Sequence, residues 1–287
     1  MKVPIKDAYS KTCEPKETII DKIKSLAIRL NSKNSLPRGI QEYLQQKKLI
    51  LVGEIHGTQE VPKFFGNIAA SLVNDKDKTL VILEINQDSQ KSIDNFFQTG
   101  DESILKRDPF FSRRYQDGRS SESMMKLLKR LSKISNVTVL CMDPMTGVQT
   151  MTGQERDTGM ATFINSKMNK YGRTLVLSGN IHSSIVIGTP WDKTFRPMGY
   201  ELKNMVTNLK DDQILNILVR HEKVDSWNCQ GAEVSSCLAR IGKKFPSDYS
   251  TALNWDSYFR IEDALTDGHT GTVFIRSTKV SFPFIRP

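Results

Sequence analysis

Long apolar runs are missing from this chain of 287 residues. Its longest apolar runs are the length of a β-strand, whereas a membrane-spanning helix needs about 20 consecutive apolar residues. The Gly-x-Ser-x-Gly elbow, the P-loop and the dinucleotide-binding glycine fingerprint are missing as well. These absences argue against an integral membrane protein, a serine hydrolase of the common α/β type, a P-loop NTPase and a Rossmann oxidoreductase.

Cysteine and histidine are scarce, with four residues of each. No two cysteines form a Cys-x-x-Cys pair, which argues against a zinc pattern and against a disulfide-dense scaffold. Cys141 lies within an apolar strand pattern, where we expect a buried small hydrophobe. Cys229 and Cys237 flank a loop that contains glycine, and they either close a short disulfide in an oxidising compartment or remain free thiols.

The basic residues form no dense patch, although the formal net charge is +9. Lysines and arginines are spread along the whole chain without interleaved aromatics, so we expect a solvated basic surface and no specific binding of nucleic acid. The N-terminus lacks the apolar segment of a signal peptide. We still favour an exported protein, periplasmic or secreted, over a cytoplasmic one, because a Cys229–Cys237 disulfide would point to export.

Apolar runs of strand length alternate with stretches of helical periodicity. The predicted strands cover residues 49–54, 79–85, 137–143, 175–179, 213–220 and 271–276. Strands spaced by helices predict βαβ units, and therefore an α/β fold with a central, mostly parallel (mixed) sheet flanked by helices on both faces. We expect one domain overall, with residues 1–47 as a helical arm packed on an α/β core of residues 48–287.

Two of the predicted strands end in the same pattern. The first ends in Gly53-Glu54-Ile55-His56, and another ends in Gly179-Asn180-Ile181-His182, so that both read Gly-x-x-His. In parallel α/β sheets, ligands bind beyond the carboxyl ends of the strands. The sequence therefore predicts two imidazoles, His56 and His182, on one edge of the sheet.

His56 is the strongest candidate for chemistry. A histidine titrates near neutral pH and can take a proton from water, while a neighbouring carboxylate orients its tautomer and stabilises the imidazolium. Glu54 precedes His56 by two residues, and Glu60 follows it by about one helical turn, so either can be that carboxylate. Glu84 ends the second predicted strand, where a carboxylate is either a site residue or a buried ion-pair partner.

Arg119 lies in a loop, residues 115–121, that leads into a helix. Its guanidinium can bind a carboxylate, a phosphate or a developing oxyanion, or it can form a salt bridge with Asp117 or Glu122. The dipeptide Arg156-Asp157 at a predicted helix start has the same ambiguity.

These segments resemble a superfamily that groups erythromycin esterases, ChaN-like haem-binding proteins and Tiki/TraB proteins, and the chain looks closest to a bacterial branch of unassigned function. The resemblance rests on residues 53–60 and 179–182, with support from residues 83–85, 116–121, 156–157 and 227–229. It implies an α/β fold with a site at strand ends, where Glu54 and His56 match the first motif and His182 the second.

The branches of the superfamily imply different chemistry. In erythromycin esterases the corresponding histidine is held to activate water without a metal, whereas Tiki proteins are regarded as metal-dependent peptidases with paired Gly-x-x-His motifs. This chain departs from the esterase pattern, because one residue and not two separates Glu54 from His56. Macrolide hydrolysis is therefore unsupported, and the ligating residues of the haem-binding branch are not found in this sequence.

The leading hypothesis is a hydrolase that acts on an ester or amide of a small molecule or peptide. His56 would activate water with the help of Glu54 or Glu60, while His182 and Arg119 would stabilise the oxyanion or the leaving group.

A second version of the hypothesis uses a divalent metal to lower the pKa of bound water. Its ligands would be His56, His182 and a carboxylate from Glu54 or Glu84. The alternatives without turnover are a haem-binding or metal-binding protein, and a further alternative is a secreted effector or toxin domain. The sequence identifies neither the substrate nor an oligomeric state.

Overall fold

The computed structural model describes residues 16–30, 36–73, 77–144, 151–231, 233–244, 253–266 and 268–285. Parts of the predicted N-terminal arm (1–15 and 31–35) and of the segment from Gln230 to Asn254 lie outside the described residues. None of the helices in the described part of the chain is long and apolar enough to cross a membrane.

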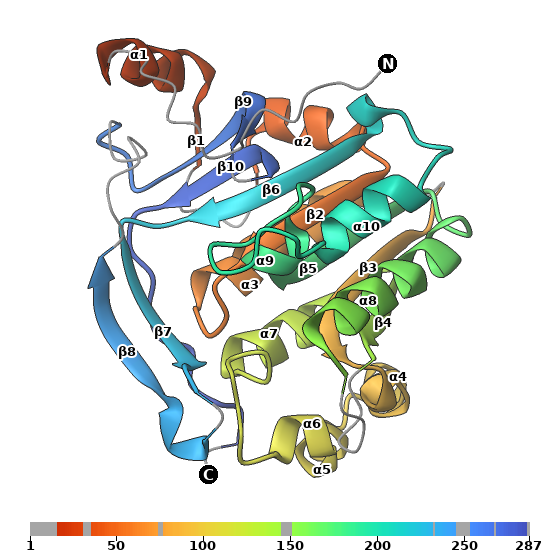
Figure 1. The fold of residues 1–287 in the computed structure, drawn as a ribbon. Helices are drawn as coiled ribbons and strands as arrows, with labels where there is room; N and C mark the ends of the chain where they lie inside the picture. Colours follow the sequence, from red (N-terminus) through yellow and green to blue (C-terminus); the bar gives the residue numbers. More distant parts are fainter. Residues whose placement is uncertain are drawn as a thin grey trace.

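An eight-stranded sheet forms the centre of the molecule (Figure 1), in the order β1-β9-β10-β6-β2-β5-β3-β4. The strands from β10 to β4 pair in parallel, while β9 runs antiparallel to both β10 and β1. The predicted mostly parallel, mixed sheet is thus confirmed. Its strands are β1 (Ile28–Arg29), β2 (Leu49–Glu54), β3 (Thr79–Asn86), β4 (Val137–Asp143), β5 (Arg173–Gly179), β6 (Ile214–Arg220), β9 (Ser257–Thr266) and β10 (His269–Ile275).

Helices cover both faces of this sheet, as predicted (Figure 1). They are α1 (Lys16–Leu26), α2 (Arg38–Gln45), α3 (Glu60–Leu72), α4 (Gln90–Thr99), α5 (Glu102–Arg107), α6 (Pro109–Ser112), α7 (Glu122–Leu131), α8 (Gly153–Met168), α9 (Asn180–Ser183) and α10 (Met198–Met205). Short 3-10 turns cover η1 (Gln87–Ser89), η2 (Asp211–Gln213) and η3 (Val234–Ser236).

The alternation of side chains along β2 explains the two layers. Ile50 and Val52 point into an apolar core shared with α2, α3 and α7, whereas Leu49 and Leu51 point into a second core shared with α8 and α10. All four side chains are buried. Since successive side chains of a strand face opposite sides, a continuously apolar strand is one that is covered on both faces.

The six predicted strands are all present, but the sequence did not reveal β1, β9 or a separate antiparallel hairpin. This hairpin consists of β7 (Lys223–Cys229) and β8 (Cys237–Lys244), and it continues from β6 beyond the edge of the large sheet (Figure 1). Helix α3 begins only at Glu60, because Thr58, two residues before it, forms a β-bridge with Val280.

Arg173, at the start of β5, joins the sheet to two helices. Its guanidinium donates to the carbonyl oxygens of Lys47 (2.9 Å), Leu72 (3.0 Å) and Gln45 (2.6 Å). The side chain of Arg173 is buried, so water does not replace these hydrogen bonds, and the guanidinium is the donor to all three carbonyl oxygens.

We predict that Arg173→Met lowers the free energy of unfolding by about 3 kcal/mol, because it leaves buried carbonyl groups without donors. Urea denaturation followed by circular dichroism measures the change. The control is Arg38→Met, which removes an exposed pair with Glu42 and is expected to change stability by less than about 0.5 kcal/mol. Equal effects of the two substitutions would contradict the role given to Arg173.

Candidate functional site

Four neighbouring strands bring ionisable groups to one edge of the sheet. In the order β2, β5, β3 and β4, they carry Glu54, Gly179 with the following His182, Glu84 and Asp143. The parallel pairing places the carboxyl ends of these strands side by side. The edge that the sequence predicted as a ligand-binding edge is therefore where the charged side chains gather.

His56 is held by the last residue of its own strand. Its Nδ1 lies 3.0 Å from Oε1 of Glu54, and its Nε2 lies 3.6 Å from Oε2 of Glu84. Glu54 is buried, whereas the imidazole remains 20% exposed. A buried carboxylate accepting from Nδ1–H leaves the lone pair of the neutral ring on Nε2, which is the nitrogen that can take a proton.

Glu84 lies at the centre of the cluster. Its Oε1 accepts from Arg156 (2.6 Å) and Arg119 (3.2 Å), while its Oε2 accepts from the backbone N–H of Gly179 (2.7 Å). The Nε2 of His182 lies 3.8 Å from the same carboxylate. Glu84 thus contacts both Gly-x-x-His motifs and both central arginines.

Two guanidiniums are shared among the surrounding carboxylates. Arg119 donates to Asp143 (2.6 Å) and, through Nε and Nη2, to Asp117 at 2.7–3.1 Å. Arg156 donates through Nε (3.0 Å) and Nη2 (2.8 Å) to the two oxygens of Asp143. These bidentate contacts hold the arginines in one geometry.

His182 is fixed through both ring nitrogens. Its Nδ1 lies 2.8 Å from Oδ1 of Asp157, and its Nε2 lies 3.0 Å from Nη1 of Arg156. Because a guanidinium can only donate, the neutral form of this ring accepts at Nε2 and carries its proton on Nδ1, toward Asp157. Asp157 is in turn fixed by the backbone N–H of Met198 at 2.8 Å.

Gly179 separates the two imidazoles. A Cβ atom at this position would lie 3.2 Å from Nε2 of His56 and 3.3 Å from Cδ2 of His182. Both distances are tighter than ordinary van der Waals contact, so a side chain here would crowd both rings. The glycine of the second Gly-x-x-His motif therefore keeps the space beside Nε2 of His56 clear.

The charges of the cluster shift its pKa values. Burial disfavours the imidazolium of His56, but the carboxylates of Glu84 and Glu54 outweigh burial and raise the pKa of His56 above its ordinary 6.5. Burial raises the pKa of Glu54 against the opposing hydrogen bond from His56. Burial also disfavours the carboxylate of Glu84, but His182, His56 and the two arginines outweigh it and hold the pKa of Glu84 well below 4.5.

The β7–β8 hairpin packs against the loops that carry His56 and Arg119. Gly57 and Gly118 both have positive φ, and a Cβ at either would lie within 2.6 Å of the carbonyl oxygen of Trp227. The carbonyl of Gly57 accepts from the backbone N–H of Trp227 at 3.0 Å. Three backbone segments thus meet at a distance that only glycine permits.

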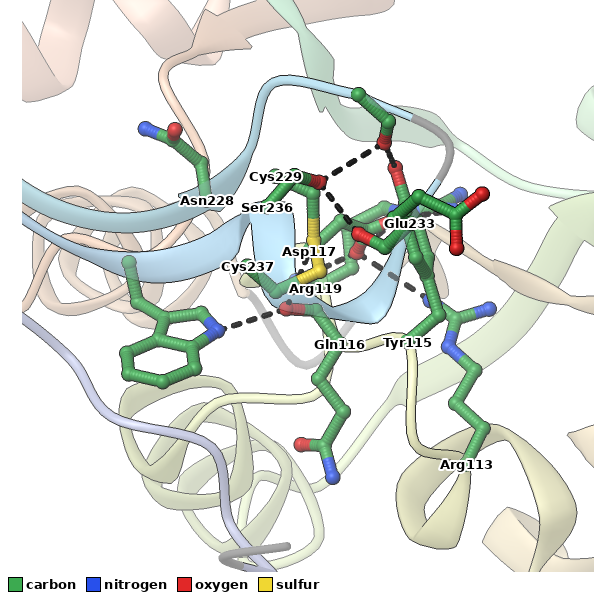
Figure 2. The surroundings of a disulfide bond; sticks show 12 residues. Arg113, Tyr115, Gln116, Asp117, Arg119, Asn228, Cys229, Glu233, Ser236 and Cys237 are labelled. Atoms are coloured by element: carbon green, nitrogen blue, oxygen red, sulfur yellow. Dashed lines mark hydrogen bonds and ion pairs between the residues drawn. A yellow bond between two sulfur atoms is a disulfide. The ribbon is translucent and has the colours of Figure 1, made fainter.

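A disulfide joins Cys229 to Cys237 at the end of the hairpin, which decides between the two states left open by the sequence. Figure 2 shows the loop from Arg113 to Arg119 lying against this end of the hairpin. The indole of Trp227 donates to the carbonyl of Gln116 (2.7 Å), and the hydroxyl of Tyr115 donates to that of Gly231 (2.9 Å). Cys141 is a free, buried thiol, as predicted.

The structure brings together five of the residues singled out from the sequence, namely Glu54, His56, Glu84, Arg119 and His182. Glu60 lies elsewhere: its carboxylate accepts from the backbone N–H of Lys279 (2.9 Å), in the wall of a pocket that none of these five residues lines. The α3 helix starts only at Glu60, so its first turn points this residue toward the C-terminal segment and not toward the ring of His56.

Three further residues belong to the centre of the cluster. Asp143 ends the predicted strand 137–143, and Arg156 and Asp157 are the pair whose role the sequence left ambiguous. A signal was available for the pair, because Thr152 and Glu155 form a capping box that fixes the start of α8. This helix start places the side chains of Arg156 and Asp157 beside His182.

The donor set does not fit the predicted metal site of His56, His182 and Glu54 or Glu84. Both nitrogens of His182 are engaged, and the oxygens of Glu84 accept from two arginines and a backbone amide. Within the described ranges, no group of three or more His, Cys, Asp or Glu side chains is placed to hold a metal ion. The same contacts leave His182 without a nitrogen for haem iron.

Solved structures share this fold over nearly the whole chain. A Bacillus cereus protein matches with a TM-score of 0.66 and 12% identity over 95% of this chain and 100% of its own. A succinoglycan biosynthesis protein matches with a TM-score of 0.70 and 11% identity, over 93% of this chain and 98% of its own. A mutant of the erythromycin esterase EreC, in its open conformation, matches with a TM-score of 0.65 and 10% identity, over 89% of this chain and 98% of its own. No family model and no curated protein matches the sequence.

These matches show the class of fold, that of a single-domain α/β protein with a mostly parallel central sheet. More particularly, it has the fold of the erythromycin esterase EreC. The resemblance inferred from the Gly-x-x-His motifs is confirmed for the fold.

We predict that Glu84→Gln destabilises the protein by about 3–5 kcal/mol at pH 7, because it removes one of the two carboxylates that the largely buried guanidiniums of Arg119 and Arg156 share. The folded-state pKa of Glu84 is lower than 4.5, so its contribution is present above pH 4.5 and is lost as the pH falls through the folded pKa. The gap in unfolding free energy between wild type and variant should therefore shrink in acid.

Urea denaturation at pH 7 and at successively lower pH values measures this gap. Glu42→Gln, at an exposed glutamate, is the matched control and should change stability by less than about 0.5 kcal/mol. A gap that is small at pH 7, or that stays constant down to the acid limit, would show that Glu84 is not the buried anion of the cluster.

Proposed function

We propose that this protein is a hydrolase in which His56 takes a proton from the water that attacks an ester or amide. The observation that carries the proposal is the 3.0 Å contact of its Nδ1 with the buried carboxylate of Glu54, which leaves the lone pair of the neutral, partly exposed ring on Nε2. The space beside this nitrogen is kept clear by Gly179. A base and its orienting carboxylate are thereby combined, and no side chain at position 179 crowds the base.

The proton can be followed through the reaction. The oxygen of water bonds to the carbonyl carbon while Nε2 of His56 receives the proton, and the bond to the leaving group then breaks as that proton passes to it. The imidazolium formed in between lies between Glu54 at 3.0 Å and Glu84 at 3.6 Å. Two carboxylates therefore stabilise the charged state of the base.

Arg119 and His182 receive a different role from the one expected. We predicted that they stabilise the oxyanion or the leaving group, but Arg119 already donates to Asp117, Glu84 and Asp143, and His182 is bonded at both nitrogens. We assign them, together with Arg156, to holding Glu84 in place. They are positioning residues in this proposal.

The fold supports the same class of reaction. EreC is an erythromycin esterase, and this chain shares its fold. The substrate class that we propose is therefore a small-molecule ester or amide. Macrolides are not included, because the spacing of Glu54 and His56 departs from the esterase pattern. The contacts of Glu84 and His182 favour a reaction without a metal bound to those residues.

We predict that His56→Gln lowers the hydrolysis of p-nitrophenyl butyrate by about 10²–10⁴-fold, the usual contribution of a general base. Glu54→Gln should lower it through loss of tautomer control and charge. Glu60→Gln is the control, since Glu60 bonds to Lys279 and not to His56, and it should retain activity. The measurement is kcat/KM of proteins whose folding is verified by circular dichroism.

The pH dependence gives a second readout of the same variants. His56 acts as a base only when neutral, so kcat/KM should rise with pH through a pKa above 6.5, and Glu54→Gln should move that pKa down. Full activity of His56→Gln refutes the proposal. Activity that is lost with a chelator and restored by a divalent metal would favour the metal-dependent version instead.

A further inference from the structure

A pocket lies away from the strand-end cluster, between the first turn of α3 and one face of α7. Its volume is about 390 Å³, and its walls include Lys63, Lys126, Arg130 and Lys279. Pockets that bind small molecules have volumes of about 300–1,000 Å³. The space therefore suits a small organic molecule and is larger than a single inorganic ion requires.

The walls of this pocket are strongly basic. Four cationic side chains face a single carboxylate, that of Glu60, whose Oε2 accepts from the backbone N–H of Lys279 at 2.9 Å. Among the ion pairs of the described residues, none joins any of the four cations to a carboxylate. Like charges gathered around one space repel each other, and an anion in that space would relieve the repulsion.

Arg130 is held in position before any ligand arrives. Its Nη1 donates to Oδ1 of Asn67 at 2.6 Å, and a Cβ at Gly66 would lie 3.2 Å from that same nitrogen. The glycine thus makes room for the guanidinium against α3, and the asparagine fixes its orientation. A guanidinium that is already ordered loses less freedom when it binds a ligand.

We propose that this pocket binds a small molecule that carries a phosphate group. The cationic side chains that line the pocket come from α3, from α7 and from the segment at Lys279. The preferred anion is therefore one that accepts hydrogen bonds in several directions. A tetrahedral phosphate does so, whereas a carboxylate accepts mainly in one plane, and arginine with lysine is a common phosphate-binding combination.

The site is independent of the proposed hydrolysis but adjoins the loop of His56. Lys279 is followed by Val280, which bridges to Thr58, and by Ser281, whose N–H donates to the carbonyl of Gly57 at 2.8 Å. The pocket therefore lies against the chain segment that holds the turn after His56.

The test is calorimetric titration of the full chain with inorganic pyrophosphate at low ionic strength. We expect saturable binding at one site, weakened on the order of tenfold or more by Lys126→Gln combined with Arg130→Gln. The control combines Lys91→Gln with Lys170→Gln, two exposed lysines outside the pocket, and removes the same net charge. It should leave the affinity unchanged.

Because Arg130 packs against Gly66, Lys126→Gln alone is measured as well, and it should weaken binding without affecting folding. His56→Gln should bind pyrophosphate like the wild type, so failure of the hydrolase proposal does not affect this test. Equal loss in the control variant, absence of saturable binding, or equal affinity for citrate would overturn the proposal.

Discussion

The buried carboxylate of Glu84 is the constraint on which the whole strand-end cluster depends. A charge withdrawn from water is tolerated only when other charges and donors replace the lost solvation. Arg119, Arg156 and the N–H of Gly179 supply them, from a loop, a helix and a neighbouring strand. Once these partners are fixed, Asp143 and Asp117 follow as counter-charges to the arginines. The imidazoles lie at the rim of this network, and the carboxylates determine the charge of His56.

The fold supplies this network from parts far apart in the sequence. Parallel pairing of β2, β5, β3 and β4 brings four strand ends together, and the capping box at Thr152 sets where Arg156 and Asp157 lie on α8. The hairpin of β7 and β8 closes one side, with Trp227 packed between two glycines that could not be replaced without displacing it. The positions of His56 and Arg119 thus depend on a hairpin that is not part of the main sheet.

Much of this arrangement could be predicted from the sequence, and the reasons differ by element. The central strands β2, β3 and β5 are covered on both faces and contain apolar runs, and β4 and β6 are largely apolar, so their positions and the mostly parallel sheet were predictable. The strand β9, next to the edge strand β1, and the hairpin of β7 and β8 are less apolar and carried no such signal. His56 and His182 were found through their repeated motif. The salt bridge of Arg119 with Asp117 was one of the alternatives that the sequence left open. The contacts of Arg119 with Glu84 and Asp143, and the bonding of Glu60 to Lys279, could not be predicted, because they join residues more than twenty positions apart.

The most direct measurement of the central claim is the pKa of His56, followed by NMR titration of its imidazole in the wild type and in Glu84→Gln. The account predicts a value above 6.5 in the wild type and a lower value in the variant, because removing the carboxylate leaves burial, which disfavours the imidazolium, with less opposition. The same pKa in both proteins would contradict it, since Glu84 would then not control the charge of the proposed base.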